Sequence, residues 1–147
     1  MDQRDEQILN LLQGNARLSY QELGDALGIS RVAAKKRVQK LEQDGIIRAY
    51  NTCIYRPEEI TLLMDIVAQP GRVDDILRYI TGRTAYIRQI YRTTQKNHLH
   101  IVAVGPSVAE LKYLIKMIEK NCGDCIESLT HHGVTEVVKD VYGKILP

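Results

Sequence analysis

Apolar residues recur every three or four positions in three stretches of the first fifty residues, a spacing that predicts three amphipathic helices. The first helix ends at Gly14. The second opens on the capping box Ser19–Glu22 and ends at Gly28, and the third lies between Ser30 and Gly45. The inward-facing positions expected from this spacing are, helix by helix, Ile8, Leu11 and Leu12; Leu23, Ala26 and Leu27; and Ala34, Val38 and Leu41. Two helices joined at a tight glycine-containing turn, as the second and third are, form a helix-turn-helix.

The pattern changes to β-type alternation after the third helix. Residues 46–50 and 52–55 predict a small two-stranded wing, and Pro57 marks the expected domain boundary. Beyond it the pattern predicts a strand at 60–67, a helix between Gly71 and Gly82, strands at 85–91 and 99–104, a helix at 108–118 and a strand at 126–134. This β-α-β-β-α-β order is the ferredoxin-like arrangement. The predicted fold is therefore α+β, with a winged helix-turn-helix at residues 1–50, a linker strand at 51–59 and a ferredoxin-like domain at 60–147.

The composition is that of an ordinary soluble globular protein, since 44% of the 147 residues are hydrophobic and 26% are charged. No apolar run is long enough to cross a bilayer, and no charged-then-apolar leader opens the chain. We therefore expect neither a membrane span nor a secretory signal. Three cysteines, an odd number in such a chain, indicate reduced thiols and a cytoplasmic protein.

The net charge of +2 conceals a local excess of cations. Residues 31–40 hold five Lys or Arg and no acid, and they fall on the second helix of the helix-turn-helix. Such a run is often only a solvated helix face, but an α-helix in this position fits the major groove while Lys and Arg neutralise phosphates, which favours binding to double-stranded DNA. Arg31 and Lys35 are placed to read guanine and Val32 to touch a thymine methyl, whereas Arg37, on the flank, is better placed for phosphate. The DNA-binding residues expected are Ser30, Arg31, Val32, Lys35, Lys36, Arg37, Gln39 and Lys40.

These residues carry a family resemblance. The chain resembles the amino-terminal domain of the Lrp/AsnC family, the feast/famine transcriptional regulators of bacteria and archaea, at Asp5–Leu12, Asn15–Leu23, Leu27–Ser30, Arg37–Val38, Leu41–Glu42 and Gly45–Ile47. The resemblance implies a sequence-specific regulator, not an enzyme and without a cofactor, whose second (RAM-type) domain binds an effector and assembles a homo-oligomer. The uncovered face of the ferredoxin-like sheet would expose apolar side chains to water, which by itself predicts a dimer through residues 60–147. The family implies further association into tetramers or octamers.

The second domain departs from the family pattern at one turn. Family members carry Gly-x-Tyr/Phe-Asp between the middle strands, close to where amino acids bind. The corresponding stretch here, and the effector-binding site we expect, consists of Thr94, Gln95, Lys96, Asn97 and His98. Lys96 supplies a cation for a carboxylate, but the missing glycine makes close approach of a ligand to the backbone harder. An amino acid, another anionic metabolite, no effector at all and a merely solvated hairpin tip therefore remain open.

A C-x-x-C motif at Cys122–Cys125, followed by His131 and His132, provides a thiol- or metal-responsive alternative. The same residues also fit an ordinary Gly-Asp turn. Adjacent strand residues point to opposite faces, so the two histidines cannot both face one ion, and we expect no metal site. His98 and His100, by contrast, alternate on one strand and share a face, either in a ligand or metal site or on a half-exposed sheet.

An enzyme is the remaining alternative. Sirohaem decarboxylases resemble the same two-domain layout, and Tyr91–Arg92 followed by a His-containing strand is loosely similar to their active-site strand. The basic helix would have no use in such an enzyme. We therefore expect no catalytic residues.

Overall fold

The computed structural model describes residues 1–52, 54–83 and 85–139. They divide into two compact units, one built on Met1–Tyr55 and the other spanning Arg56–Val137, and each is considered by itself. None of the helices in these residues combines the length and apolar character needed to cross a membrane.

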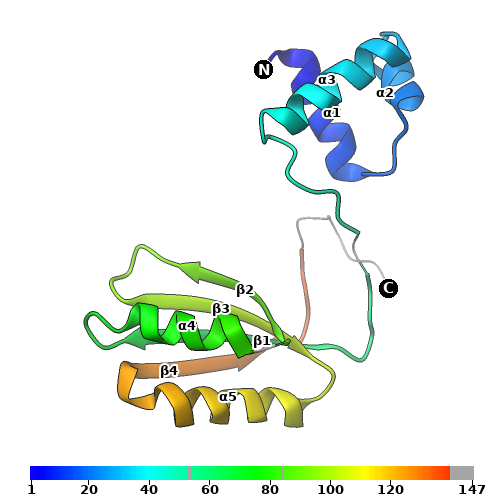
Figure 1. The fold of residues 1–147 in the computed structure, drawn as a ribbon. Helices are drawn as coiled ribbons and strands as arrows, with labels where there is room; N and C mark the ends of the chain where they lie inside the picture. Colours follow the sequence, from blue (N-terminus) through cyan, green and yellow to red (C-terminus); the bar gives the residue numbers. More distant parts are fainter. Residues whose placement is uncertain (53, 84, 140–147) are drawn as a thin grey trace. The chain divides into compact units, whose positions relative to one another are not determined.

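The first unit is a bundle of three helices, α1 (Gln3–Gly14), α2 (Tyr20–Leu27) and α3 (Arg31–Gln43), as Figure 1 shows. Each helix starts at a polar cap whose side chain accepts a backbone N–H: Asp2, Ser19 and Ser30. The buried core of the three-helix bundle consists of Ile8, Leu23, Ala34, Val38 and Leu41. The three predicted helices and the inward stripe of the third are confirmed.

The inward face of α2 differs from the prediction, because Gly24 is buried and Ala26 is exposed. Both positions fit a helical stripe through Leu23, so spacing alone does not separate them. The space available at each position distinguishes them. A Cβ at Gly24 would lie 2.7 Å from the carbonyl oxygen of Ile29. That oxygen belongs to the turn between α2 and α3, whose own Ile29 N–H donates to the Gly24 carbonyl over 2.9 Å. The absence of a side chain at Gly24 is what lets α2 approach the turn.

The segment after α3 contains no strand among its described residues, so the wing strands at 46–50 and 52–55 and the linker strand at 51–59 are not found. β-branched and aromatic residues such as those of this segment favour strands only where a partner strand is available. Here the backbone N–H groups of Ile46 and Ile47 both donate to the Leu41 carbonyl and close the end of α3. Ile47 packs on the helical core, and the Tyr50 hydroxyl donates to Glu42 over 2.7 Å.

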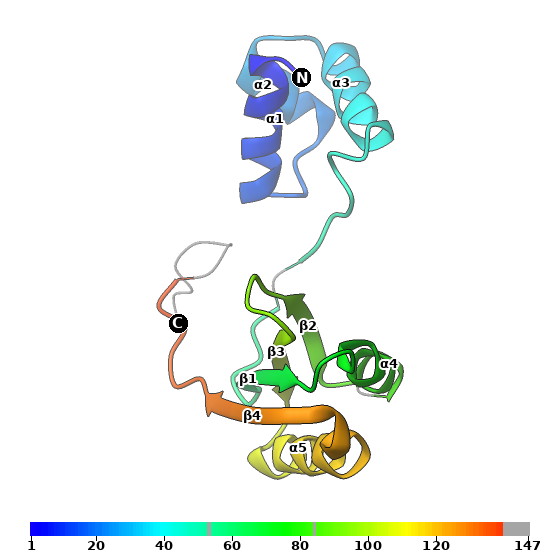
Figure 2. The same ribbon diagram turned by 90° about the vertical axis from the view of Figure 1, so that its left-hand side faces the viewer.

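The second unit is a four-stranded antiparallel sheet with two helices. Its elements are β1 (Ile60–Ala68), α4 (Val73–Arg83), β2 (Ile87–Arg92), β3 (His98–Gly105), α5 (Val108–Cys122), a short 3₁₀ turn (Gly123–Cys125) and β4 (Ile126–Gly133). The strands lie in the order β2-β3-β1-β4, which confirms the ferredoxin-like β-α-β-β-α-β arrangement (Figures 1 and 2).

The two faces of this sheet differ in cover. Alternate residues of β1 and β3, among them Met64, Ile66 and Ile101, are buried against α4 and α5. The intervening residues form what we call the open face. It carries half-buried Leu63, Asp65, Val67, His98, His100, Val102 and Val104 from the two central strands.

Candidate nucleic-acid interface

The outward side of α3 gathers the cationic residues predicted for DNA binding. Ala34, Val38 and Leu41 are buried on the opposite side, so Arg31, Lys35, Lys36, Gln39 and Lys40 all lie exposed on one face. Val32, in the first turn, is 75% exposed although it is apolar. The structure thus brings together six of the eight predicted residues as one solvent-facing surface, which we call the α3 face.

The start of α3 is held in a defined conformation. Gly28 adopts a left-handed backbone (φ 64°), which lets the chain reverse within three residues. The Ser30 hydroxyl then accepts the Ala33 N–H over 3.1 Å. These contacts fix the first turn of α3, the part of a recognition helix that reaches base edges.

The α3 face keeps most of its positive charge unpaired. Lys40 forms an ion pair with Asp44 over 2.8 Å, and this hydrogen bond raises the pKa of the Lys40 ammonium. Within the described residues, Arg31, Lys35 and Lys36 have no ion pair, since the ion pairs of α3 involve Arg37 and Lys40. Three adjacent uncompensated cations on a helix suit a polyanion.

Arg37 differs from the other α3 cations. Its side chain is 29% exposed, and its Nη1 lies 2.7 Å from Asp5 Oδ1 and 2.8 Å from Asp2 Oδ2. These hydrogen bonds raise the pKa of the Arg37 guanidinium. The pKa of Asp2 is lowered, first by the Asp5 backbone N–H and then by Arg37. The structure therefore places Arg37 against α1, in contact with two acids that the sequence analysis did not pair with it.

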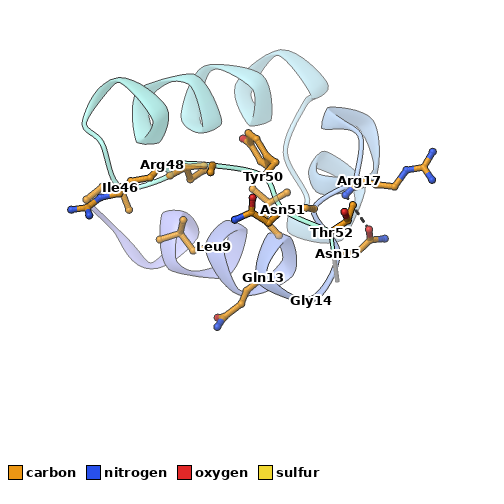
Figure 3. A pocket seen from close by; sticks show the side chains of 14 residues that line it. Leu9, Gln13, Gly14, Asn15, Arg17, Ile46, Arg48, Tyr50, Asn51 and Thr52 are labelled. Atoms are coloured by element: carbon orange, nitrogen blue, oxygen red, sulfur yellow. Dashed lines mark hydrogen bonds between the residues drawn. The ribbon is translucent and has the colours of Figure 1, made fainter. Parts of the chain in front are cut away.

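A hollow of about 740 Å³ lies elsewhere in the same unit (Figure 3). The end of α1, the following loop and the segment 46–52 form its walls. It is lined by Leu9, Leu12, Gln13, Gly14, Asn15, Ala16, Arg17, Ile46, Ile47, Arg48, Ala49, Tyr50, Asn51 and Thr52. The described residues of the α3 face take no part in it, so this hollow and the cationic surface are separate features.

The predicted effector stretch forms the tip of the β2–β3 hairpin, where backbone groups of Gln95 and His98 and the His98 ring bond within the hairpin. The Thr93 hydroxyl lies 2.6 Å from His98 Nδ1 and accepts the Gln95 N–H over 3.2 Å. Asn97 takes a left-handed backbone (φ 58°), which asparagine adopts more readily than most residues. Thr94 and Lys96 remain exposed at the tip.

His98 and His100 face an acid that the sequence analysis missed. Asp65 Oδ1 lies 2.9 Å from His98 Nε2 and 2.9 Å from His100 Nδ1 on the open face. The hydrogen bond with His100 is the largest of the causes that lower the pKa of the Asp65 carboxyl, with that of His98 also contributing. A single acid within the apolar run of β1 was the available signal. Its partners, 33 and 35 positions away, were not evident from the chain.

The two cysteines at the end of α5 are free thiols buried beneath the surface. Arg72 Nη2 lies 2.9 Å from Cys125 Sγ, but burial is the largest influence on both thiols and raises the pKa of each. His131 and His132 are exposed and pair with successive β1 residues, so they point to opposite faces. In the parts of the chain that the structure describes, no three His, Cys, Asp or Glu residues are arranged to hold a metal ion.

Comparison with known proteins identifies the family to which the chain belongs. A model described as winged helix-turn-helix DNA-binding matches residues 1–48. An uncharacterized HTH-type transcriptional regulator of Pyrococcus furiosus is 30% identical over 126 residues, which cover 82% of this chain and 81% of that protein. The structure of Escherichia coli AsnC has the same fold, with a TM-score of 0.81 and 23% identity over 93% of each chain. So does a transcriptional regulator of Neisseria meningitidis in complex with L-Met, with a TM-score of 0.84 and 16% identity over 100% of this chain and 96% of that one. The chain belongs to the Lrp/AsnC family of transcriptional regulators, with a DNA-binding helix-turn-helix at its amino-terminal end.

Proposed function

We propose that this regulator recognises specific DNA sequences by inserting α3 into the major groove. The observation that carries the proposal is the α3 face, in which unpaired cations and an exposed apolar residue project opposite a buried stripe. Such a face matches the chemistry of the groove, where base edges and thymine methyl groups lie between two rows of phosphates.

Each residue of the α3 face has a distinct proposed role. Arg31 and Lys35 donate to guanine O6 and N7, and Val32 contacts a thymine methyl. Gln39 is suited to an adenine edge, while Lys36 and Lys40 neutralise phosphates. The Ser30 hydroxyl accepts from the backbone through its oxygen and retains its proton to donate to a phosphate.

We propose that the open face of the sheet joins two copies of the chain. Its central strands carry half-buried Leu63, Val67, Val102 and Val104, which would otherwise remain partly in water. Two-fold symmetry would then present two α3 helices to paired half-sites, and dimers could associate further into tetramers or octamers. In this scheme residues 1–50 bind DNA, 51–59 connect and 60–147 assemble the oligomer.

A small metabolite is the proposed regulator, and an amino acid is the first class to test. The support is that the Neisseria meningitidis protein of the same fold is a complex with L-Met. The hairpin tip at Thr94–His98 is the proposed site, with the exposed Lys96 ammonium as partner for a carboxylate. Because Lys96 is the only cation among the five residues of this tip, we place most of the affinity for an anionic ligand on its ammonium group.

The protein is proposed to act in the cytoplasm and to catalyse no reaction. The relative from Pyrococcus furiosus is described as a transcriptional regulator, and Arg92, half of the enzyme-like Tyr91–Arg92 pair, forms an ion pair with Asp74. One contact favours a thiol-responsive regulator, namely that of Arg72 with Cys125. Burial opposes it, because a thiol whose pKa is raised holds little of the reactive thiolate.

The experiment that tests the proposed function is genomic footprinting of the purified chain, followed by gel shifts on the footprinted operator. Replacing Lys35 and Lys36 together by Ala should weaken operator binding by about 1–3 kcal/mol for a contact to a base. The matched control replaces Lys112 and Lys116, which are exposed on α5, and alters net charge equally. Equal operator affinity in the two double variants would contradict α3 as the recognition helix.

A further inference from the structure

Arg37 ties the middle of α3 to the first residues of α1 by several short hydrogen bonds. Its Nη1 donates to Asp5 Oδ1 over 2.7 Å and to both oxygens of Asp2, over 2.8 and 3.0 Å. Arg37 lies 35 positions from Asp2 and 32 from Asp5 in the chain. This charged contact therefore fixes tertiary structure, unlike the local Lys40–Asp44 pair on the same helix.

The two acids are also held in place by contacts within the first turn of α1. Asp2 and Asp5 form the capping box of α1, in which the Asp2 N–H donates to Asp5 Oδ2 and the Asp5 N–H donates to Asp2 Oδ1, each over 2.9 Å. Asp5 is only 15% exposed, so its contact with Arg37 is shielded from water. Two fixed acceptors, of which Asp5 is largely buried and Asp2 is exposed, give this ion pair a defined direction.

Direction matters because a hydrogen-bonded ion pair specifies the angle at which α3 faces α1, which the burial of apolar side chains does not specify by itself. Hydrophobic contacts between helices are non-directional. Side-chain tips lie roughly 6 Å from a helix axis, so a rotation of about 20° would move the outward tips by about 2 Å. A base-edge hydrogen bond does not survive that displacement, whereas a long-range attraction to phosphates hardly changes.

We propose that Arg37 is a positioning residue rather than a phosphate contact. Together with Asp2 and Asp5 it sets the rotation of α3, and thereby sets how much more tightly the protein binds its operator than unrelated DNA. The inference rests on the proposed role of α3 as the recognition helix.

The test measures the affinity of the full chain for the footprinted operator and for a scrambled duplex of equal length, over a range of salt concentrations. The variants are Arg37→Gln, Arg37→Lys and Asp5→Asn, with Lys36→Gln as the matched control from the exposed face. Thermal denaturation verifies that each variant is folded at the assay temperature. Arg37→Gln should lose operator affinity by about tenfold, with scrambled-duplex affinity and salt slope unchanged, and Arg37→Lys should recover part of the loss. Lys36→Gln should reduce the salt slope on both duplexes by about one.

The Asp5→Asn variant separates the two roles of Arg37 even if Arg37→Gln does not fold. A positioning Arg37 predicts that Asp5→Asn lowers operator affinity as Arg37→Gln does, and that combining the two adds little. A phosphate contact predicts the reverse, because loosening the guanidinium from Asp5 leaves it freer to meet DNA. The proposal is overturned if Arg37→Gln weakens both duplexes equally and lowers the salt slope, if it leaves operator affinity intact, or if Asp5→Asn strengthens binding. Failure of the Lys35 and Lys36 double variant to affect the operator would instead overturn the recognition-helix function itself, and this inference with it.

Discussion

Gly24→Ala tests whether the close approach of α2 to its turn holds the helix-turn-helix together. The added Cβ would lie 2.7 Å from the Ile29 carbonyl oxygen and 3.3 Å from both the Arg31 nitrogen and the Ser30 carbonyl carbon. All three are backbone atoms of the turn and the start of α3, so relief requires the turn to move. Overpacking of this kind costs about 1–3 kcal/mol, and the 2.7 Å contact with a backbone atom places Gly24 at the upper end.

The intrinsic preference of Ala for helix works in the opposite direction, and a second variant measures it. Ala is favoured over Gly by about 1 kcal/mol within a helix, so Gly24→Ala should lower the free energy of unfolding of the first unit by about 2 kcal/mol. Gly14→Ala in α1 is the matched control, since nothing lies within 4 Å of a Cβ there and the variant should be neutral or stabilising. Urea unfolding with amide hydrogen exchange on α2 and α3 measures both variants. If Gly24→Ala proves as stable as Gly14→Ala, the steric explanation of the α2–α3 turn is refuted.

Three further outcomes are expected in the second unit. The pKa of Asp65 in the folded protein lies below its ordinary value of 3.8. The carboxylate therefore stabilises the fold above pH 3.8, and this contribution is lost as the pH falls through the lower folded-state pKa. Asp65→Asn should remove this dependence and flatten the acid side of the stability profile measured by thermal denaturation. Val102→Lys on the open face should convert the proposed dimer to a monomer in light scattering, and a wild-type monomer at micromolar concentration would contradict the dimer. Lys96→Ala should abolish the thermal shift given by an amino or keto acid that stabilises the wild type, and equal stabilisation of both proteins would place the ligand elsewhere.

The elements that the sequence predicted are those whose signals are local. A cap followed by apolar residues at helical spacing located all three amino-terminal helices, and alternation located the four strands of the sheet. The segment at 46–55 failed for a physical reason: β-branched residues indicate a strand only when another strand is available to pair with it, and here the backbone closes α3 instead. The burial of Gly24 was not predicted because a glycine carries no hydrophobic signal, although its small size is what the turn requires.

The partners that sequence reasoning missed all depend on long-range folding. The exposed face of α3 followed from burial periodicity within one helix, so its residues could be named in advance. Arg37 belongs to the same run of cations, yet its partner acids lie in α1, and no local pattern pairs residues 32 positions apart. Asp65 meets His98 and His100 only because β1 and β3 are adjacent in the sheet. In each case the fold brings a charged side chain into contact with a partner that is distant in the sequence.

These contacts explain how a chain with a net charge of only +2 presents a cationic surface. Several acids of the first unit are held by partners other than the exposed α3 cations. Glu22 accepts the Ser19 N–H over 2.7 Å, which lowers the pKa of its carboxyl and keeps it charged at the α2 terminus. Asp2 and Asp5 cap α1 and bind Arg37, and Glu42 accepts from the Tyr50 hydroxyl. Among the described residues, Arg31, Lys35 and Lys36 therefore keep their charge without an ion pair, so the direction of the field around the first unit depends on where the acids are bound more than on the net charge of +2.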